Sequence, residues 1–390
     1  MKRRIHVWDL PKNKIYVQFN EDFRKNLFNL AIKEFGSFVK LGKFLNVKRA
    51  DTTIATNWRN GTNCCPLDLM IKLANKISVP LKELEKNIKE VRYKSNIHKR
   101  GGNSGKPIIN PKLPIVIDDN FAEILGHICG DGTISRSNIK KGIYLKYINS
   151  EPVLIEKFKR LIKETFGKIE PNIQIRGGGN YKRPNYYLQY PSIVSMSVLK
   201  VFDYKPKGGM NIPDFIFGMS KKSKARFLRA LFDDESCVIA GKGISIGLKP
   251  INPLKNIKLL IEELGIKTGN LYSYKIPSGD MWRFSIGKMK SLKRFDKIIG
   301  FVHPSKSEKL KYTIYKKRRF ERYDNSEPKN KIINLLKDKG ELTADEISKE
   351  LNRSKETIIQ HLRNIHKDGL INNLNNQNRS VWYINQQNVA

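Results

Sequence analysis

Two stretches of this chain, residues 124–132 and 228–236, share one pattern and lie 104 residues apart. In each stretch, apolar residues at helical spacing lead to an acidic end, which is Asp131 in the first copy and Glu235 in the second. The matching positions Gly126 and Ala230 are small, so two such helices can approach each other backbone to backbone. The pattern therefore predicts two helices that each end in a carboxylate and that leave room for the close approach of a partner helix.

The segments that follow each stretch also recur in the same order. After Asp131 we predict strands at 132–136 and 143–149, a helix at 152–166, strands at 172–176 and 185–190, and a helix at 192–202. After Glu235 we predict strands at 237–240 and 243–247, a helix at 253–264, strands at 270–276 and 282–286, and a helix at 288–299. This order, αββαββα, predicts an α+β fold made of two pseudo-symmetric repeats.

The N-terminal segment is predicted to be all-α apart from one short strand at 15–19. Helices are expected at 21–35, 37–45, 50–59, 66–76 and 81–91, and the pair at 37–45 and 50–59 has helix-turn-helix spacing. The segment resembles Cro/repressor-like domains, which implies that Ile54 and Trp58 point inward. The resemblance also turns one face toward the DNA major groove: Lys48, Arg49, Thr52, Thr53, Thr56 and Asn57. The alternative is a helical core that does not touch DNA.

The C-terminal segment has the order of a winged helix. Helices are predicted at 328–339, 343–351 and 355–367, followed by a hairpin that includes 381–384. The resemblance to winged helix-turn-helix domains implies that the third helix faces DNA with Arg353, Lys355, Thr357, Gln360, His361 and Arg363, and that Arg379 lies in the wing. A dimerisation or packing module is the alternative.

These patterns divide the chain into six expected parts. They are a helix-turn-helix domain at 1–92, a basic Gly/Pro linker at 93–114, the repeats at 115–204 and 205–303, a basic helix and linker at 304–326, and a winged helix at 327–390.

The net charge of +37 implies a polyanionic partner, and double-stranded DNA is the first candidate. A membrane partner is not expected, because no segment approaches the roughly 20 apolar residues of a spanning helix. The 4 cysteines form no CxxC pair, which favours a reduced, cytoplasmic protein without structural zinc. We expect a monomer, because both repeats lie in one chain.

The paired stretches and the doubled order resemble the LAGLIDADG family of homing endonucleases. The resemblance implies a DNA-binding saddle in which Asp131 and Glu235 hold Mg²⁺ (or Mn²⁺) and both strands of a long site are cut to leave short 3′ overhangs. It also implies that strand side chains read the DNA: Lys146, Arg176, Lys182, Arg183, Tyr186, Tyr274, Lys275 and Arg283.

Two positions depart from the family pattern. Ser236 replaces the usual final glycine of the motif, and the basic residue that often follows the second strand is present as Lys249 but matches Ser150 in the first repeat. We therefore predict unequal cutting of the two strands and a nicked intermediate. The chain begins with Met1 and ends in Asn388-Val389-Ala390, rather than with the terminal residues of an intein, so we expect it to be free-standing.

Other interpretations remain open. Asp131 could be only a helix-terminal aspartate, with Asp233, Asp234 and Glu235 forming a solvated acidic end. The whole chain could be a sequence-specific transcriptional regulator that has lost cleavage, or, with less support, an RNA maturase that assists intron splicing. Cleavage of DNA in the presence of magnesium separates these possibilities.

Overall fold

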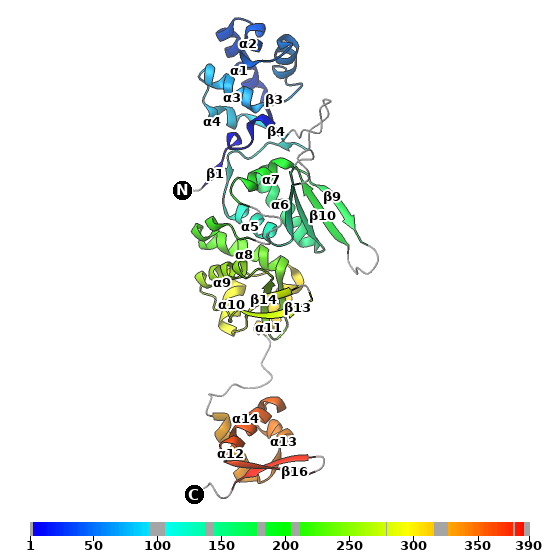
Figure 1. Cartoon of the computed structure of the whole chain (residues 1–390), viewed down its shortest axis with the longest axis vertical. Coiled ribbons are helices and arrows are strands. Elements are labelled where there is room, and N and C mark those ends of the chain that lie inside the picture. The colour runs from blue at the N-terminus through cyan, green and yellow to red at the C-terminus, as the bar shows by residue number, and fades with distance from the viewer. Residues whose placement is uncertain are drawn as a thin grey trace. The chain divides into compact units, whose positions relative to one another are not determined.

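The computed structural model describes residues 3–93, 106–136, 143–177, 184–203, 211–277, 279–315, 327–376 and 379–385. The chain divides into two compact units, Met1–Tyr315 and Lys316–Ala390 (Figure 1). Each unit has its own hydrophobic core. Within the described ranges, no helix combines the length and apolar character needed to cross a membrane.

The N-terminal domain combines helices with a sheet. Its main elements are β2 (Ile15–Phe19), α1 (Glu21–Phe35), α2 (Phe38–Leu45), the helical turn η3 (Asp51–Trp58), β3 (Cys65–Pro66), α3 (Leu67–Lys76), α4 (Leu81–Lys86), β4 (Ile88–Tyr93) and β5 (Ile108–Ile109). The four strands form one sheet in the order β3-β2-β4-β5. The prediction of an all-α domain is therefore wrong.

The error arises at residues 81–91, which were predicted to be one helix. Helix α4 ends at Lys86, and the chain continues as β4, which pairs antiparallel with β2 and buries Ile88 and Val91. These side chains find their partners in a strand about seventy residues earlier, so a tertiary contact overrides the local helical pattern.

The helix-turn-helix part has a defined turn. Ser37 caps α2, since its Oγ accepts a hydrogen bond from the Lys40 amide, and Asn46 ends the helix with a left-handed φ of 56°. A Cβ on Gly42 would lie 2.2 Å from Cβ of Ala50, so only glycine allows this close approach. The following segment is a π-helix rather than an α-helix, and it buries Ile54 and Trp58 as expected.

The two repeats follow with closely matching elements. The first contains α5 (Asp119–Cys129), β7 (Gly132–Arg136), β8 (Ile143–Asn149), α6 (Pro152–Phe166), β9 (Asn172–Arg176), β10 (Asn185–Tyr190) and α7 (Ser192–Leu199). The second contains α8 (Lys221–Glu235), β11 (Ser236–Ile239), β12 (Gly243–Leu248), α9 (Ile251–Glu263), β13 (Tyr272–Ile276), β14 (Gly279–Ile286) and α10 (Met289–Ile298), and α11 (Pro304–Tyr315) comes next. The sheet orders, β7-β8-β10-β9 and β11-β12-β14-β13, correspond strand for strand.

Helices α5 and α8 pack directly against each other (Figure 1). A Cβ on Gly126 would lie 2.2 Å from the carbonyl oxygen of Phe227 and 2.8 Å from Cβ of Ala230. The predicted close approach at these two small residues is present, and it brings the C-terminal ends of both helices together.

The start of the chain returns to the first repeat. Strand β1 (Arg4–Ile5) pairs antiparallel with β6 (Ile115–Val116), which immediately precedes α5. The backbone of Ile109, at the end of β5, also exchanges hydrogen bonds with that of Lys168 after α6. The N-terminal domain is thus connected to the first repeat in more than one place.

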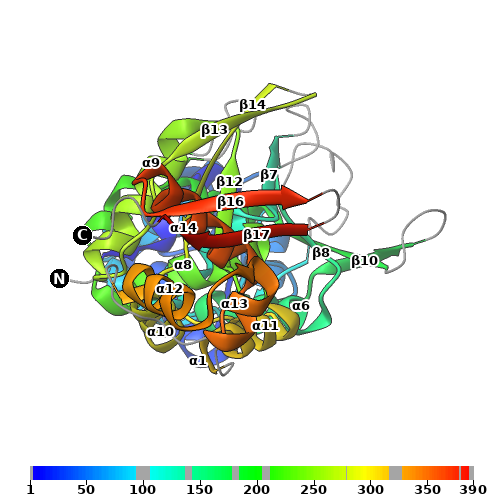
Figure 2. The same cartoon turned by 90° about the horizontal axis from the view of Figure 1, so that it is seen from below.

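The C-terminal unit contains α12 (Glu327–Lys339), β15 (Leu342–Thr343), α13 (Ala344–Glu350), α14 (Lys355–Lys367), β16 (Ile371–Asn376) and β17 (Arg379–Ile384). Strands β16 and β17 form the hairpin seen in Figure 2. Thr343 and Glu346 form the predicted capping box, and Ser354 caps α14. Helix α11 is described as far as Tyr315, and the rest of the predicted basic helix and linker, residues 316–326, lies outside the described residues.

Candidate active site

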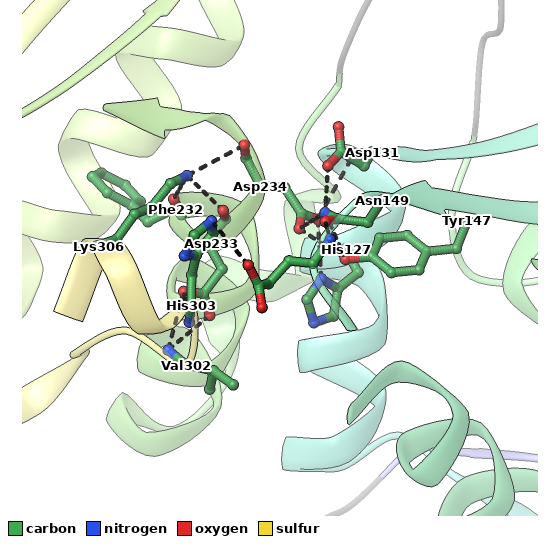
Figure 3. Close-up of polar contacts among 11 residues, drawn as sticks. His127, Asp131, Tyr147, Asn149, Phe232, Asp233, Asp234, Val302, His303 and Lys306 are labelled. Atoms are coloured by element: carbon green, nitrogen blue, oxygen red, sulfur yellow. Dashed lines mark hydrogen bonds and ion pairs between the residues drawn. The ribbon is translucent and has the colours of Figure 1, made fainter. Parts of the chain in front are cut away.

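The packed helices place several acidic residues at one end of the α5–α8 pair. Helix α5 ends at Cys129, with Gly130 and Asp131 following, and α8 ends at Glu235. Figure 3 shows His127, Asp131, Tyr147 and Asn149 close to Asp234, and Lys306 on the other side of Asp233. We refer to Asp131, Asp234 and Glu235 as the acidic cluster.

Asp234 is the buried centre of a hydrogen-bond network. Its side chain is completely buried, with Oδ2 3.0 Å from Nδ1 of His127 and Oδ1 2.9 Å from the hydroxyl of Tyr147. Nδ2 of Asn149 and the amide of Asp131 lie farther away, at 3.4 and 3.5 Å. Burial disfavours a charged His127, but the carboxylates of Asp234, Asp233 and Glu123 together outweigh burial and raise the pKa of this imidazole.

The first repeat leaves room for Asp234. A Cβ on Gly130 would lie 2.6 Å from Cβ of Asp234, so the carboxylate occupies space that exists only because residue 130 is glycine. Asp234 thereby joins α8 of the second repeat to α5 and β8 of the first. Gly130 and Asp234 are matching motif positions, so the network has no counterpart on the other side.

Asp131 is held by Asn149. Nδ2 of Asn149 donates to Oδ2 of Asp131 at 2.7 Å, while Oδ1 of Asn149 accepts from the amide of Glu151 at 2.8 Å. Burial, followed by repulsion from Asp234 and Glu235, raises the pKa of Asp131 to about 7. The pKa of Glu235 is also raised, first by burial and then by Asp234. Burial and mutual repulsion therefore both disfavour the ionised forms of these carboxylates.

Lys306 supplies a positive charge beside this cluster. It lies on α11, and its Nζ donates to the carbonyl oxygens of Phe232, Asp233 and Asp234 at 3.1, 2.5 and 3.4 Å. These carbonyls belong to the last turn of α8, where a cation is favourable. Burial lowers the pKa of Lys306. The prediction missed this residue, and its only signal was a position within the basic segment 304–326.

Asp233 has a structural role. Its carboxylate accepts hydrogen bonds from the amides of Val302 and His303, which immediately precede α11. Burial raises its pKa to about 6, against the effect of these hydrogen bonds. Because Asp233 and the side chain of Asp234 are buried, the alternative of a solvated acidic end is wrong.

The departure from the family pattern at Ser236 does not strain the chain. Ser236 has an extended backbone with φ −86°, and its Oγ donates to the Phe232 carbonyl at 2.6 Å. Lys249 is exposed and forms no ion pair with an acid among the described residues. The catalytic role of Lys249 stays a prediction, and Lys306 is the lysine that contacts this helix end.

The donor chemistry fits a hard divalent cation. No group of three or more His, Cys, Asp or Glu is arranged as a metal site in the part of the chain that the structure describes. Magnesium, however, is commonly held by one or two carboxylates completed by water and phosphate. Asp131 and Glu235 repel each other, and a cation between such groups relieves that repulsion.

The first sheet presents basic residues on one face. Lys146 pairs with Gln189 and Arg176 with Asn185, so by strand alternation both lie on the face of Tyr187, whose ring is 4.6 Å from the Arg176 guanidinium carbon. A pocket of about 600 Å³ opens on this face. Tyr186 is half-buried and packs partly against the core, and its contact with DNA stays a prediction.

The second sheet divides the predicted residues between two faces. Arg283 stacks on Tyr274 at 4.9 Å and donates to its hydroxyl at 2.7 Å. Lys275 pairs with Asp280, and strand alternation places it on the opposite face from Arg283. Lys182 and Arg183 lie outside the described residues.

The helix-turn-helix candidates are partly or fully exposed. Arg49 is exposed with a left-handed φ of 53°, while Thr53 donates to the Lys48 carbonyl at 3.2 Å and Asn57 is half-buried. On α14, the exposed residues Lys355, Gln360 and Arg363 include one ion pair, Lys355 to Asp345 at 2.7 Å. Their contact with DNA stays a prediction.

Comparison with known proteins identifies relatives for both units. Residues 326–373 match the family model described as bacterial regulatory protein, arsR family. The chain is 34% identical over 87 residues to homing endonuclease I-ApeI of Aeropyrum pernix, covering 22% of this chain and 38% of that protein. It is 28% identical over 240 residues to a glutamine–fructose-6-phosphate aminotransferase of Methanocaldococcus jannaschii, covering 59% of this chain and 20% of that protein.

The chain thus spans well under half of the length of these two relatives. A solved complex of I-DmoI with DNA and Mn aligns with 47% of this chain and 96% of its own, at 16% identity and a TM-score of 0.35. The central part of this protein has a LAGLIDADG-type fold related to that of homing endonucleases, and an ArsR-type helix-turn-helix lies at its C-terminal end.

Proposed function

We propose that this protein is a site-specific DNA endonuclease that hydrolyses both strands of a long double-stranded site by metal-assisted phosphodiester hydrolysis. The observation that carries the proposal is the junction of α5 and α8. There, two matching helix ends bring Asp131 and Glu235 into electrostatic contact, with Lys306 at the same helix end. Neighbouring buried carboxylates with raised pKa values are frequent at reaction centres.

The residues at the junction of α5 and α8 have different roles in the proposed reaction. Asp131 and Glu235 would hold Mg²⁺ (or Mn²⁺), which orients the attacking water, lowers its pKa and neutralises the leaving oxygen when bound. Asn149 fixes the orientation of Asp131 through its 2.7 Å hydrogen bond. Lys306 fixes the end of α8 and offsets part of the negative charge as DNA phosphates approach.

DNA binding would use the outward faces of the repeats. In the proposed arrangement, the repeats are related by a pseudo-twofold axis along the α5–α8 contact and form a saddle. Lys146, Arg176 and Arg283 lie on strands of the two sheets, and the chain's charge of +37 favours a polyanion. The flanking helix-turn-helix modules would lengthen the recognised site.

The network around Asp234 supports unequal cutting of the two strands. Asp131 is held by Asn149, which belongs to a buried network, whereas no described residue forms the corresponding hydrogen bond to the Glu235 carboxylate. The carboxylate of Asp131 is therefore held in a better-defined orientation than that of Glu235. We expect a nicked plasmid to accumulate before the linear product.

The test is cleavage of a plasmid library by the full chain with Mg²⁺, with Mn²⁺ and with EDTA. We expect linear product only with metal, and losses of about 100-fold or more for Asp131→Asn and Glu235→Gln. Glu308→Gln, which removes an exposed carboxylate of α11, should cleave like the natural protein. Cleavage that survives in both Asp131→Asn and Glu235→Gln would refute the assignment.

A second candidate is a sequence-specific DNA-binding regulator that lacks cleavage. The observation that favours it is the match of residues 326–373 to the arsR family of regulatory proteins. Selection of bound sequences from a random DNA pool distinguishes the two functions. A regulator would enrich a defined sequence and leave it uncut in Mg²⁺ and in Mn²⁺, whereas the endonuclease would cut the enriched sequence.

A further inference from the structure

A second charged site lies at the other end of α8. A pocket of about 480 Å³ is formed by the first half of α8, the end of α9 and helix α10. Its basic residues include Lys221, Arg229 and Arg294, and its apolar lining consists of Ala225, Leu264 and Ile298. Lys221 lies about 21 Å from Glu235 along α8, and Arg229, the α8 residue of the pocket nearest to Glu235, lies about 9 Å from it at 1.5 Å per residue. The pocket is therefore distinct from the acidic cluster.

Two arginines of this pocket are held in place by main-chain carbonyls. Nε of Arg229 donates to the carbonyl oxygen of Ile299 at 2.6 Å, and Nε of Arg294 donates to that of Leu264 at 2.8 Å. Ile299 and Leu264 are the C-terminal caps of α10 and α9. These bonds use one N–H of each guanidinium and leave the two terminal nitrogens to bind something else.

The backbone makes room for one of these groups. A Cβ on Gly265 would lie 2.7 Å from a terminal nitrogen of Arg294, and Gly265 has a φ of 74°, which favours glycine. The guanidinium of Arg294 thus packs over a position without a side chain. A fixed guanidinium loses less conformational entropy on binding an anion than a free surface arginine does.

The charge of the pocket is only partly neutralised. Arg226 pairs with Glu123 at 2.5 Å and Lys222 pairs with Asp119 at 3.0 Å. In the described ranges, by contrast, no carboxylate forms an ion pair with Lys221, Arg229 or Arg294. Two oriented guanidinium groups and one lysine therefore share the pocket without an acidic partner.

We propose that this pocket binds a phosphate group, carried by a mononucleotide or by the end of a nucleic-acid strand. The planar guanidinium groups of Arg229 and Arg294 have the geometry to donate paired hydrogen bonds to phosphate oxygens. Their positive charge, together with that of Lys221, is larger than a single carboxylate ligand would balance. The apolar lining can contact the sugar or base attached to that phosphate. The N-terminus of α8, at Lys221, adds a favourable helix dipole.

The test uses the full chain and isothermal titration at fixed salt. The probes are inorganic phosphate, adenosine monophosphate and adenosine. We expect saturable binding of adenosine monophosphate, weaker binding of inorganic phosphate and none of adenosine. Arg294→Gln should weaken adenosine monophosphate binding about tenfold or more, since it removes hydrogen bonds to a charged group. Arg160→Gln is the matched control, because Arg160 is an exposed arginine on α6 of the first repeat.

Separate measurements test whether each variant is correctly folded. Melting curves are recorded for every variant, and Lys221→Gln serves as a second variant because Lys221 is exposed. We expect Lys221→Gln to weaken binding with an unchanged melting temperature. The proposal is refuted if the natural protein shows no saturable binding of adenosine monophosphate, or if Lys221→Gln and Arg294→Gln both bind it as the natural protein does.

A further arm distinguishes the two sources of phosphate. Short DNA with a 5′ phosphate is compared with the same DNA lacking it, for the natural protein and for Arg294→Gln. A strand end as ligand predicts a preference for the phosphorylated DNA that Arg294→Gln abolishes, and a mononucleotide as ligand predicts no such preference. Glu235→Gln should bind adenosine monophosphate normally, so loss of the proposed cleavage would leave this result unchanged.

Discussion

Replacing Asp131 with asparagine should stabilise the metal-free protein. Asp131 is buried beside Asp234 and Glu235, and its pKa is raised from 3.8 to about 7. Its ionised form is therefore unfavourable in the folded state. Asparagine keeps the shape of the side chain and can still accept the hydrogen bond from Asn149, but it carries no charge.

The sign and size of this change in stability follow from the linkage between proton binding and folding. The folded protein binds the Asp131 proton more tightly than the unfolded chain does, so the free energy of unfolding falls as pH rises from about 4 to about 7. The difference between 3.8 and about 7 corresponds to about 4 kcal/mol above pH 7, at about 1.4 kcal/mol for each pKa unit. Because relaxation and water penetration reduce such repulsion, we expect Asp131→Asn to gain about 2 kcal/mol at pH 8.

The assay is chemical denaturation in EDTA at pH 8 and pH 5, with the transition of the unit Met1–Tyr315 followed by circular dichroism. The gain should be largest at pH 8 and clearly smaller at pH 5, where Asp131 is protonated in the folded protein but already largely ionised in the unfolded chain. Asp280→Asn, at an exposed position on β14, should change stability little at either pH. The reasoning is refuted if Asp131→Asn is destabilising at pH 8, or if the gain is equal at both pH values.

Three other changes test the remaining features. Gly126→Val should lower the free energy of unfolding by at least about 3 kcal/mol, since the valine side chain would overlap the Phe227 carbonyl. Gly218→Ala should be tolerated, because the added Cβ would have no atom within 4 Å. Denaturation curves measure both effects. Lys306→Met should slow DNA cleavage about 10-fold or more. It should also move the midpoint of the pH–rate profile to higher pH, because Lys306 lowers the pKa of Asp131, and an unmoved midpoint would contradict this. Removal of residues 327–390 should leave the melting of the other unit unchanged, because the cores are separate, and weaken DNA binding in gel-shift assays; an altered melting temperature would count against separate folding.

Much of the repeat architecture could be predicted because it is encoded locally. The bounds of α6, β9 and β10 match the predicted 152–166, 172–176 and 185–190 residue for residue. In these segments apolar side chains recur with the periods of a helix or a strand, and Pro152 and Gly167 mark the ends of α6. The close approach of α5 and α8 could likewise be predicted from Gly126 and Ala230.

The parts that could not be predicted depend on distant contacts. Strand β4 exists because β2 is beside it, and no local pattern separates it from the end of α4. Lys306 reaches the acidic cluster from a helix 71 residues after Glu235, so no spacing rule connects them. The sequence gives one weak indication that Asp234 is unusual, because it is a charged residue at the position that Gly130 occupies in the first copy. Its hydrogen bonds to His127 and Tyr147 follow only from the packing of the two repeats.

The pairing of β1 with β6 limits how far the N-terminal domain can move from the first repeat. Arg4 and Ile5 pair with Val116 and Ile115, so the chain between them forms a loop that is closed at both ends on the first repeat. A module held at two points explores less space than one on a single tether. In the proposed function, its effective concentration near DNA bound by the repeats is correspondingly high, and the affinity of the two parts together would exceed that of either part without any new contact.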